Sequence, residues 1–241
     1  TDREYWNEWY PADWVSESFP GQFRNWFYAL LTESTVMTGI APFRSLFAYA
    51  LLLDEHGEEM HKSRGNSIPF DEAAERIGAD VMRWLFVNHN PAANLNFGYN
   101  VAHEVMRRFI LTLWNSYAFF ITYARLEDFD PTRRQLPVAD RALLDRWIIA
   151  RLHETTGEVR AGLESYDPPR AARAVESFVD DLSNWYIRRN RRRFWKTEAG
   201  VEAPEAAFLT LWECLVGLSK LLAPMMPFLA EELYQNLVRT V

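Results

Sequence analysis

Apolar residues recur at helical spacing through most of the second half of the chain. The pattern covers residues 101–125, 139–165, 168–196 and 203–222, and a further helix begins at Pro227. Spacings of three and four residues between apolar positions indicate helices that bury one face. The breaks between these stretches contain the turn-forming residues Pro131, Pro137, Pro168, Pro169, Gly200 and Pro204. The pattern predicts a bundle of long helices.

The residues before this bundle follow a different pattern. Residues 1–20 mix aromatic and polar residues with prolines, which predicts irregular or short extended structure. Apolar residues at helical spacing follow over 22–35, and the continuous apolar run at 44–53 predicts a buried strand of a parallel sheet. Two shorter helices are expected next, one with Asp71 as its capping residue and one over 79–87. This order predicts a small α/β part in front of the bundle.

A polar segment follows the predicted strand, and we call residues 58–66 the lysine loop. It reads Glu-Glu-Met-His-Lys-Ser-Arg-Gly-Asn and comes after a turn at 54–57. A strand, a tight turn, a polar loop with a lysine and then a helix suit phosphate binding at the carboxyl end of a sheet. Taken alone, Lys62 is more typical of a solvated surface charge than of a phosphate-binding group. Evidence for phosphate binding therefore has to come from other segments of the chain.

The lysine loop resembles the second signature of class I aminoacyl-tRNA synthetases, Lys-Met-Ser-Lys-Ser followed by Gly-Asn. The matching residues are Met60, Lys62, Ser63, Gly65 and Asn66. Glu59 and His61 stand where the signature has its first lysine and its first serine. The resemblance implies that Lys62 and Ser63 act in catalysis, on charge that develops on the phosphates of ATP. It also implies ATP contacts from Met60, His61, Gly65 and Asn66, although a neutral spacer is an equal alternative for the histidine.

Three further segments resemble parts of isoleucyl-tRNA synthetases, in the same order along the chain. Residues 21–28 are similar to a Gln-x-Arg-Gly-Trp-Phe segment, and residues 183–195 are similar to a segment of the anticodon-binding domain. Residues 222–232 are similar to the closing Ala-Pro-x-x-Pro-Phe-x-x-Glu-Glu stretch. The resemblance implies that Gln22 lies near ATP and that Trp26 lines the isoleucine side-chain pocket. The helical spacing of Trp26 equally permits a place in the core.

The resemblance implies a mainly α fold, in which a helical bundle of the anticodon-binding type is preceded by the C-terminal part of a Rossmann-like α/β catalytic domain. We expect the catalytic part over 1–90 and the tRNA-binding domain over 91–241, with a connector rich in Pro and Asn at 88–99. The chain has no first signature of the His-x-Gly-His type, so we interpret it as a piece of a larger ligase that is inactive alone. The complete enzyme would use isoleucine and ATP with Mg²⁺, and tRNA(Ile) would be its partner.

Two alternatives stay open from the sequence. Valyl-, leucyl- and methionyl-tRNA synthetases share this layout, although residues 25–28 and 183–195 favour the isoleucine enzyme. A free-standing RNA-binding module with no catalytic role would be a protein of a different class. Adding tRNA to the chain with and without ATP analogues would separate a ligase segment from such a module.

The formal net charge of −7 argues superficially against an RNA partner, but contacts with a phosphate backbone depend on local charge. From Arg188 to Lys196 there are six cationic residues and no acidic one. The predicted tRNA-binding residues share one helix face and are Trp185, Arg188, Arg189, Arg192 and Lys196. Arginine beside an aromatic ring suits both base stacking and phosphate contact. Some of these arginines could instead form internal ion pairs with Glu176, Asp180 or Asp181.

Composition sets further limits on the class of protein. Hydrophobic residues make up 49% of the chain, which is enough for a sizeable core. The single cysteine, Cys214, cannot form an internal disulfide and excludes a cysteine-type metal site, so no protein-bound metal is expected. There is no signal peptide and no apolar run of membrane-spanning length. We therefore expect a cytoplasmic monomer without membrane contact.

Overall fold

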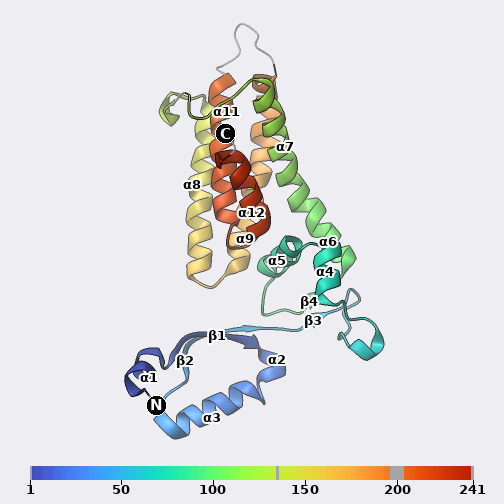
Figure 1. Cartoon of the computed structure of the whole chain (residues 1–241), viewed down its shortest axis with the longest axis vertical. Coiled ribbons are helices and arrows are strands. Elements are labelled where there is room, and N and C mark those ends of the chain that lie inside the picture. Colours follow the sequence, from blue (N-terminus) through green and yellow to red (C-terminus); the bar gives the residue numbers. More distant parts are fainter. Residues whose placement is uncertain (1, 134–135, 196–203, 240–241) are drawn as a thin grey trace. The chain divides into compact units, whose positions relative to one another are not determined.

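The chain divides into two compact units. The computed structural model describes residues 2–133, 136–195 and 204–239 (Figure 1). The first unit contains Thr1–Ser67 and His89–Gly98, and the second contains Ile68–Asn88 and Tyr99–Val241. The fold is mainly α, as predicted. The predicted boundary after residue 90 separates a catalytic part from a tRNA-binding part. A division by contacts does not test the function of each part, so this boundary stays a prediction.

The first unit contains a parallel pair of strands joined by helices. β1 (Ala12–Ser18) pairs with β2 (Phe43–Tyr49), with Ala12 opposite Phe43 and Ser18 opposite Tyr49. The connection contains α2 (Phe19–Gln22) and α3 (Trp26–Thr38), which gives the β-α-β order that parallel strands require. The strand and the helix predicted for this part are therefore present, but no residue of β2 is buried in this chain, so the predicted burial of the strand is wrong.

Two features of the first unit differ from the predictions. The apolar run at 44–53 forms two strands, because β2 ends at Tyr49 and β3 (Leu52–Leu53) pairs in parallel with β4 (Leu95–Asn96) instead. Both strands are apolar, so the sequence pattern did not show the change of partner. α1 (Arg3–Trp9) was not predicted, because none of its residues is buried and no apolar periodicity marks it.

The second unit is a helical bundle (Figure 1). Its helices are α4 (Phe70–Arg76), α5 (Ala79–Asn88), α6 (Tyr99–Val105), α7 (Leu111–Leu126), α8 (Leu143–Glu164), α9 (Pro168–Asp180), α10 (Arg188–Asn190), α11 (Pro204–Leu222) and α12 (Pro227–Tyr234). The long helical stretches and the last helix are confirmed. Wider, π-helical turns at Met106–Ile110, Asp181–Ile187 and Gln235–Arg239 interrupt or extend them. These wider turns were not predicted from the sequence.

The core of the bundle is centred on α11, which is buried along most of its length. Fully buried core residues include Leu113, Ile148, Phe178, Leu211, Leu215 and Leu218. Cys214 lies in this helix without exposed surface, and burial raises the pKa of its thiol, so the group stays protonated and inert. Met225 and Met226 are also buried, as predicted. Within the described ranges no helix combines the length and the apolar character needed to cross a membrane.

The helix predicted to start at Asp71 starts one residue earlier. Pro69 is the residue before α4, and Asp71 lies inside the first turn of the helix without capping it, so the predicted capping role is wrong. Gly78, with a φ of 94°, then separates α4 from α5.

α5 ties the beginning of the second unit to the end of the chain. The Asp80 carboxylate accepts a hydrogen bond of 2.6 Å from the backbone N–H of Leu229, in the first turn of α12. Arg83 donates to the backbone carbonyls of Pro224 and Met225, at 2.9 Å each. Asp80 thus caps α12 from a distant part of the sequence, and Arg83 satisfies carbonyl groups just after α11.

Trp84 anchors α5 in the bundle. Its side chain has no exposed surface, and its ring stacks on Phe109 with 4.1 Å between the ring centroids. The indole N–H donates to Glu176 of α9 at 3.1 Å, and Asn88 donates to the same carboxylate oxygen at 2.7 Å. A tryptophan held in this way by both its ring and its N–H contributes strongly to packing.

A buried ion pair lies inside the bundle. The two terminal nitrogens of Arg193 each contact a carboxylate oxygen of Asp145 at 2.8 Å, and the two side chains are 7% and 0% exposed. The Tyr186 hydroxyl donates to the same carboxylate at 2.7 Å, and burial together with that negative charge raises the pKa of the tyrosine. Asn190 accepts a hydrogen bond of 3.0 Å from Arg193. These contacts join α8 to the helical segment that ends at Phe194.

Gly162 permits the close approach of α8 and α9. A Cβ at this position would lie 2.9 Å from the backbone N of Ala171 and 3.0 Å from the carbonyl oxygen of Asp167. Gly162→Ala should lower the free energy of unfolding by about 1–3 kcal/mol, because the backbone cannot give way without moving the helices apart.

Gly157→Ala is the matched control in the same helix. Nothing lies within 4 Å of a Cβ at this position, so alanine should raise the free energy of unfolding by roughly 1 kcal/mol through helix propensity alone. Urea denaturation of the two variants measures the difference. Equal effects of the two substitutions would contradict the close packing at Gly162.

Candidate functional site

The lysine loop begins at a tight turn after β3. Asp54 N–H donates to the carbonyl of Glu58 at 2.8 Å, and Leu53 forms an antiparallel bridge with Glu59. The turn itself passes through Gly57, whose φ of 83° lies in the left-handed region that favours glycine. The strand, turn and loop therefore follow one another as predicted, and the turn directs the chain back along the end of β3.

The centre of the loop is a single 3-10 turn over Lys62–Arg64. Gly65 follows with a φ of 71°, and nothing lies within 4 Å of a Cβ built on it. The side chains of Lys62 and Ser63 are exposed, and neither makes an ion pair or side-chain hydrogen bond to any other residue that the structure describes. A cation and a hydroxyl group are thus presented to solvent beside an uncovered stretch of backbone.

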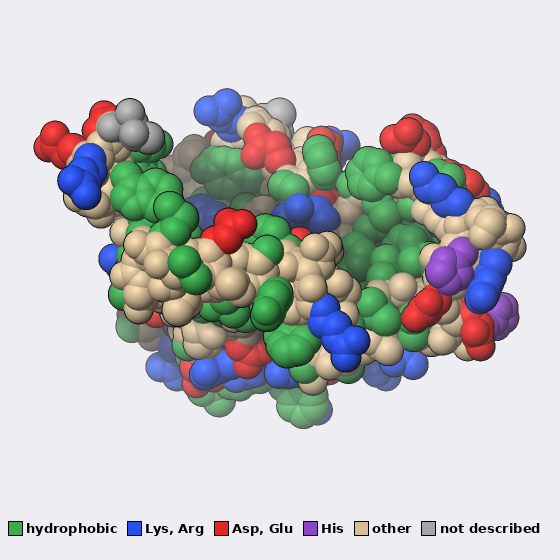
Figure 2. Space-filling model, turned by 90° about the horizontal axis from the view of Figure 1, so that it is seen from below, with side chains coloured by type: hydrophobic (Ala, Val, Ile, Leu, Met, Phe, Trp, Pro, Cys, Tyr) green, Lys and Arg blue, Asp and Glu red, His purple; other side chains and the backbone are tan. Residues whose placement is uncertain are grey.

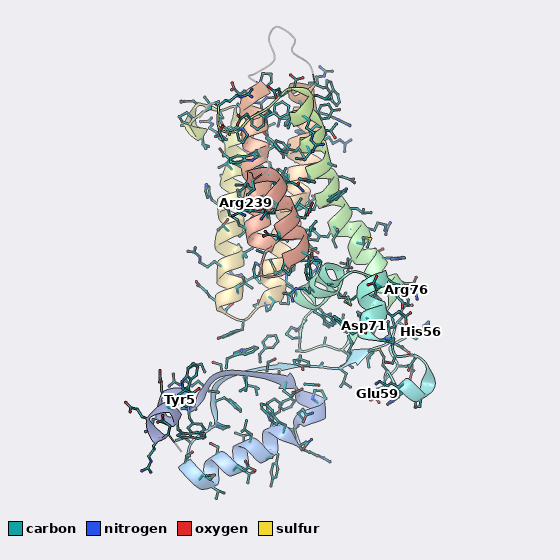
Figure 3. All side chains as sticks on the ribbon, viewed as in Figure 1. Tyr5, His56, Glu59, Asp71, Arg76 and Arg239 are labelled. Atoms are coloured by element: carbon teal, nitrogen blue, oxygen red, sulfur yellow. The ribbon has the colours of Figure 1, made fainter. Side chains whose placement is uncertain are left out.

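His61 and Glu59 form the charged edge of the loop. The imidazole Nε2 of His61 lies 3.5 Å from a carboxylate oxygen of Glu59, and both side chains are exposed. Figure 3 labels Glu59 and His56 on this segment. In Figure 2 the purple histidine side chains lie among acidic and basic ones at the right-hand edge. The two residues that depart from the synthetase signature therefore contact each other rather than Lys62.

Asn66 is held inside the loop by all of its polar side-chain atoms. Its amide nitrogen donates to the Asp54 carboxylate at 2.8 Å and to the carbonyl of Glu59 at 3.1 Å. Its amide oxygen accepts from the backbone N–H of His61 at 2.9 Å. The predicted ATP contact of Asn66 stays a prediction, and the structure gives this side chain a role in the shape of the loop.

Asp54 is the acceptor of the hydrogen bond from the Asn66 amide. Its second carboxylate oxygen accepts from the backbone N–H groups of His56 and Glu58, at 2.9 Å each. The hydrogen bonds from Glu58 and Asn66 hold the pKa of the Asp54 carboxyl below its usual range. The carboxylate is therefore the ionised form at neutral pH, and it accepts three hydrogen bonds at the neck of the loop.

Gln22 and Trp26 lie in the same unit, Gln22 at the end of α2 and Trp26 at the start of α3. The Gln22 side-chain oxygen accepts from the backbone N–H of Trp26 at 3.4 Å, and the Trp26 ring is 39% exposed. The neighbouring Phe27 is the buried residue of this turn, at 3% exposure. Trp26 is thus on the surface of the unit, where it is free to line a pocket. Met60 is half-buried in the lysine loop. The roles predicted for these residues stay predictions.

A second candidate site is an exposed group of arginines and tryptophans in the other unit, which we call the arginine surface. It consists of Trp185, Arg188, Arg189, Arg191, Arg192 and Trp195. The guanidinium carbon of Arg189 lies 3.8 Å from the ring centroid of Trp185, and that of Arg191 lies 5.0 Å from the ring centroid of Trp195. Both tryptophans are exposed, at 46% and 40%. Each of these two arginines therefore lies within cation–π distance of an exposed tryptophan.

The alternative of internal ion pairs fails for these arginines. Glu176 accepts from Trp84 and Asn88, Asp180 accepts from Asn184, and Asp181 pairs with Arg151. Over the described residues, the four arginines of the arginine surface form no ion pair. Arg193 does pair internally, but with Asp145. Lys196, the fifth predicted tRNA-binding residue, lies outside the described residues.

Two contributors were missed from the sequence. Asp54 was read only as part of a turn, although an aspartate at the start of a turn and an asparagine at the end of the following loop are residues that cap backbone N–H groups. Arg191 was not chosen because its spacing from Trp185 places it on another face of an ideal helix. Its aromatic partner is instead Trp195, which follows four residues later, just after the 3-10 turn at Arg191–Phe194.

Two known families match the chain. Residues 1–98 match the family described as tRNA synthetases class I (I, L, M and V), and residues 145–240 match the anticodon-binding domain of tRNA ligase. The first match contains the lysine loop and the second contains the arginine surface. The two candidate sites thus lie in segments that match two different families.

Curated relatives are similar over nearly the whole chain. The isoleucine–tRNA ligase of Dehalococcoides mccartyi (strain CBDB1) is 45% identical over 96% of this chain, and that of Thermus thermophilus is 44% identical over 99%. The chain spans 23% of the length of each of these relatives.

Solved structures share the fold at lower identity. Mycobacterium tuberculosis methionyl-tRNA synthetase in complex with methionyl-adenylate has a TM-score of 0.78 and 19% identity, over 97% of this chain and 45% of its own. The Agrobacterium radiobacter K84 agnB2 LeuRS, in a ternary complex with tRNA and LeuAMS, has a TM-score of 0.66 and 20% identity, over 95% of this chain and 27% of its own.

Proposed function

Because the chain belongs to the class I tRNA synthetases, as a segment that spans 23% of the isoleucine–tRNA ligases it matches, we propose that it supplies the lysine loop and part of the tRNA-binding surface of such a ligase. The complete enzyme would join isoleucine to tRNA(Ile) at the expense of ATP, as a monomer in the cytoplasm. The names of the relatives favour isoleucine over valine, leucine and methionine. We also propose that the segment alone does not form the adenylate.

Lys62 carries the catalytic part of this proposal. Its ammonium group is exposed and forms no ion pair in the described part of the chain, so a ligand can reach it. ATP, with its Mg²⁺, supplies phosphates on which negative charge increases as pyrophosphate leaves. A lysine that meets this charge mainly in the transition state lowers the barrier more than it tightens ground-state binding. Ser63 adds a hydroxyl donor, and the uncovered backbone at Gly65 allows close approach of a phosphate.

The arginine surface carries the RNA-binding part, and it is the single observation on which this part depends. Four arginines without acidic partners among the described residues create local positive potential on a chain whose formal net charge is −7. The exposed tryptophans Trp185 and Trp195 suit stacking with unpaired bases. The guanidinium groups suit bidentate contact with phosphate oxygens. Trp26, Gln22 and Met60 are proposed to contribute to the isoleucine and ATP sites.

Binding of tRNA by this chain should depend on salt, because each cation that neutralises a phosphate releases counterions. Changing Arg188, Arg189 and Arg192 together to Gln should weaken binding and flatten the plot of log affinity against log salt. The slope should fall by about one unit for each phosphate contact that is lost. Fluorescence titration of labelled tRNA at several salt concentrations measures this, and circular dichroism checks that the helices persist.

A matched triple variant controls for total charge. Arg76, Arg133 and Arg170 are exposed arginines of the same unit that each pair with a carboxylate. Changing these three to Gln removes the same charge and should leave the salt slope close to that of the unmodified chain. An unchanged slope in the Arg188, Arg189 and Arg192 variant would show that tRNA binds elsewhere, and unfolding of that variant would show that these arginines stabilise the bundle.

A further inference from the structure

The two ends of the lysine loop are joined by a side-chain contact. Asn66, at the end of the loop, donates to Asp54, at the turn before it, at 2.8 Å. The remaining donor and the acceptor of the Asn66 amide bind the backbone of Glu59 and His61. An amide that uses its polar atoms in this way has little left to offer a ligand.

The residues between these two ends have few other attachments. Arg64 N–H donates to the carbonyl of His61 at 3.0 Å, and Gly65 N–H donates to the carbonyl of Lys62 at 3.3 Å. Both bonds stay inside the loop, as does the contact of His61 with Glu59. In the described part of the chain, two sets of contacts therefore attach the loop to β3 and the turn at 54–57. One is the Asp54–Asn66 hydrogen bond, and the other is the pairing of Glu58 with Asp54 and of Glu59 with Leu53.

We propose that Asp54 and Asn66 act as a latch that positions the lysine loop, and that they are positioning residues for Lys62 rather than ATP contacts. This rests on the proposed function of the loop. Without the latch the backbone around Lys62 has more conformations available, and the lysine spends less of its time where the transition state needs it.

Asp54→Asn tests the latch with almost no change in shape. The side-chain oxygen that remains can still accept the two backbone N–H groups of the turn. The new amide nitrogen would face the amide nitrogen of Asn66, so two donors would meet and the hydrogen bond between the side chains would be lost. Combining Asp54→Asn with Asn66→Asp places an amide opposite a carboxylate again and restores that hydrogen bond with its direction reversed. The carbonyl of Glu59 loses its donor in this double variant, so the rescue is expected to be partial.

The first measurement uses the chain itself. Trypsin cleaves after Lys62 and Arg64, and mass spectrometry of the peptides gives the rate at each site. Asp54→Asn should increase both rates about fivefold, which corresponds to ~1 kcal/mol for one hydrogen bond. The exchanged pair should be cleaved more slowly than Asp54→Asn. Asn90→Ala is the matched control, because its side chain caps only a local turn, at Ala92, in the same unit.

The second measurement uses the complete ligase and separates the latch from the function on which it rests. Asp54→Asn should lower kcat for isoleucine-dependent pyrophosphate exchange about fivefold, with KM for ATP little changed, since the lysine is displaced for most of the time. Faster cleavage together with a lower kcat supports the proposal. An unchanged cleavage rate or an unchanged kcat would overturn it. An unaffected Lys62→Ala enzyme would instead refute the function of the loop, whatever the cleavage rates show.

Discussion

Replacing Asp145 by alanine is expected to destabilise the helical unit by about 3–5 kcal/mol, because Arg193 would keep its charge in a buried place without the carboxylate that balances it. Asp145 has no exposed surface and accepts hydrogen bonds from both Arg193 and Tyr186. Desolvation of the arginine is not recovered when the carboxylate is absent, and the Tyr186 hydroxyl also loses its acceptor. Urea denaturation followed by far-ultraviolet circular dichroism measures the loss.

Two variants calibrate this result. Tyr186→Phe removes one hydrogen bond from the same carboxylate and should cost only about 1 kcal/mol, since the ion pair stays intact. Asp13→Ala removes an exposed aspartate that pairs with Arg44 and should change stability by less than ~1 kcal/mol. A loss for Asp145→Ala as small as that for Asp13→Ala would mean that the buried pair is easily replaced by water.

Replacing Lys62 by alanine in the complete ligase is expected to remove about 2–4 kcal/mol of transition-state stabilisation, which is the scale for one group that meets developing charge. Because the Lys62 side chain forms no ion pair and no hydrogen bond among the described residues, this substitution should not disturb the fold. The maximal rate of isoleucine-dependent pyrophosphate exchange should therefore fall far more than the affinity for ATP.

A His61→Ala variant and the isolated chain serve as controls for the Lys62→Ala experiment. His61→Ala should have a much smaller effect, since His61 contacts Glu59 and is one residue away from the proposed catalytic group. The isolated chain should give no exchange above a blank without enzyme. A turnover number unchanged by Lys62→Ala would identify the lysine as a surface charge, and exchange by the isolated chain would refute its proposed inactivity.

The sequence predicted most of the second unit because its helices bury one face. The strong periodicity of α9, with Val175, Phe178 and Val179 buried, is of the kind that a single sequence reveals. α1 could not be found in this way, because its aromatic residues are exposed and nothing distinguishes it from an irregular segment. The division of 44–53 into two strands was equally hidden, since it depends on which strand each part pairs with.

The candidate sites were predicted less completely than the helices. Lys62 and Arg189 could be chosen by residue type and order, but the partners of polar residues depend on contacts between distant segments. Arg193 was counted as one more cation of an exposed run, but its side chain is buried and pairs with Asp145. The signal was present at Asp145, a lone acidic residue at the helical spacing of the buried Ile148 and Ile149. A charge on an apolar face needs a partner of opposite sign.

The order of segments along the chain limits where the chain can be truncated if the bundle is to be expressed alone. Residues 68–88 come before the last stretch of the first unit, at His89–Gly98, yet they belong to the bundle. An expressed piece that starts at Tyr99 would lack Trp84, which would uncover Phe109 and the Glu176 carboxylate. It would also lose the groups of α5 that satisfy the backbone around the start of α12. A self-sufficient bundle therefore has to include α5 and must carry His89–Gly98 as an inserted loop.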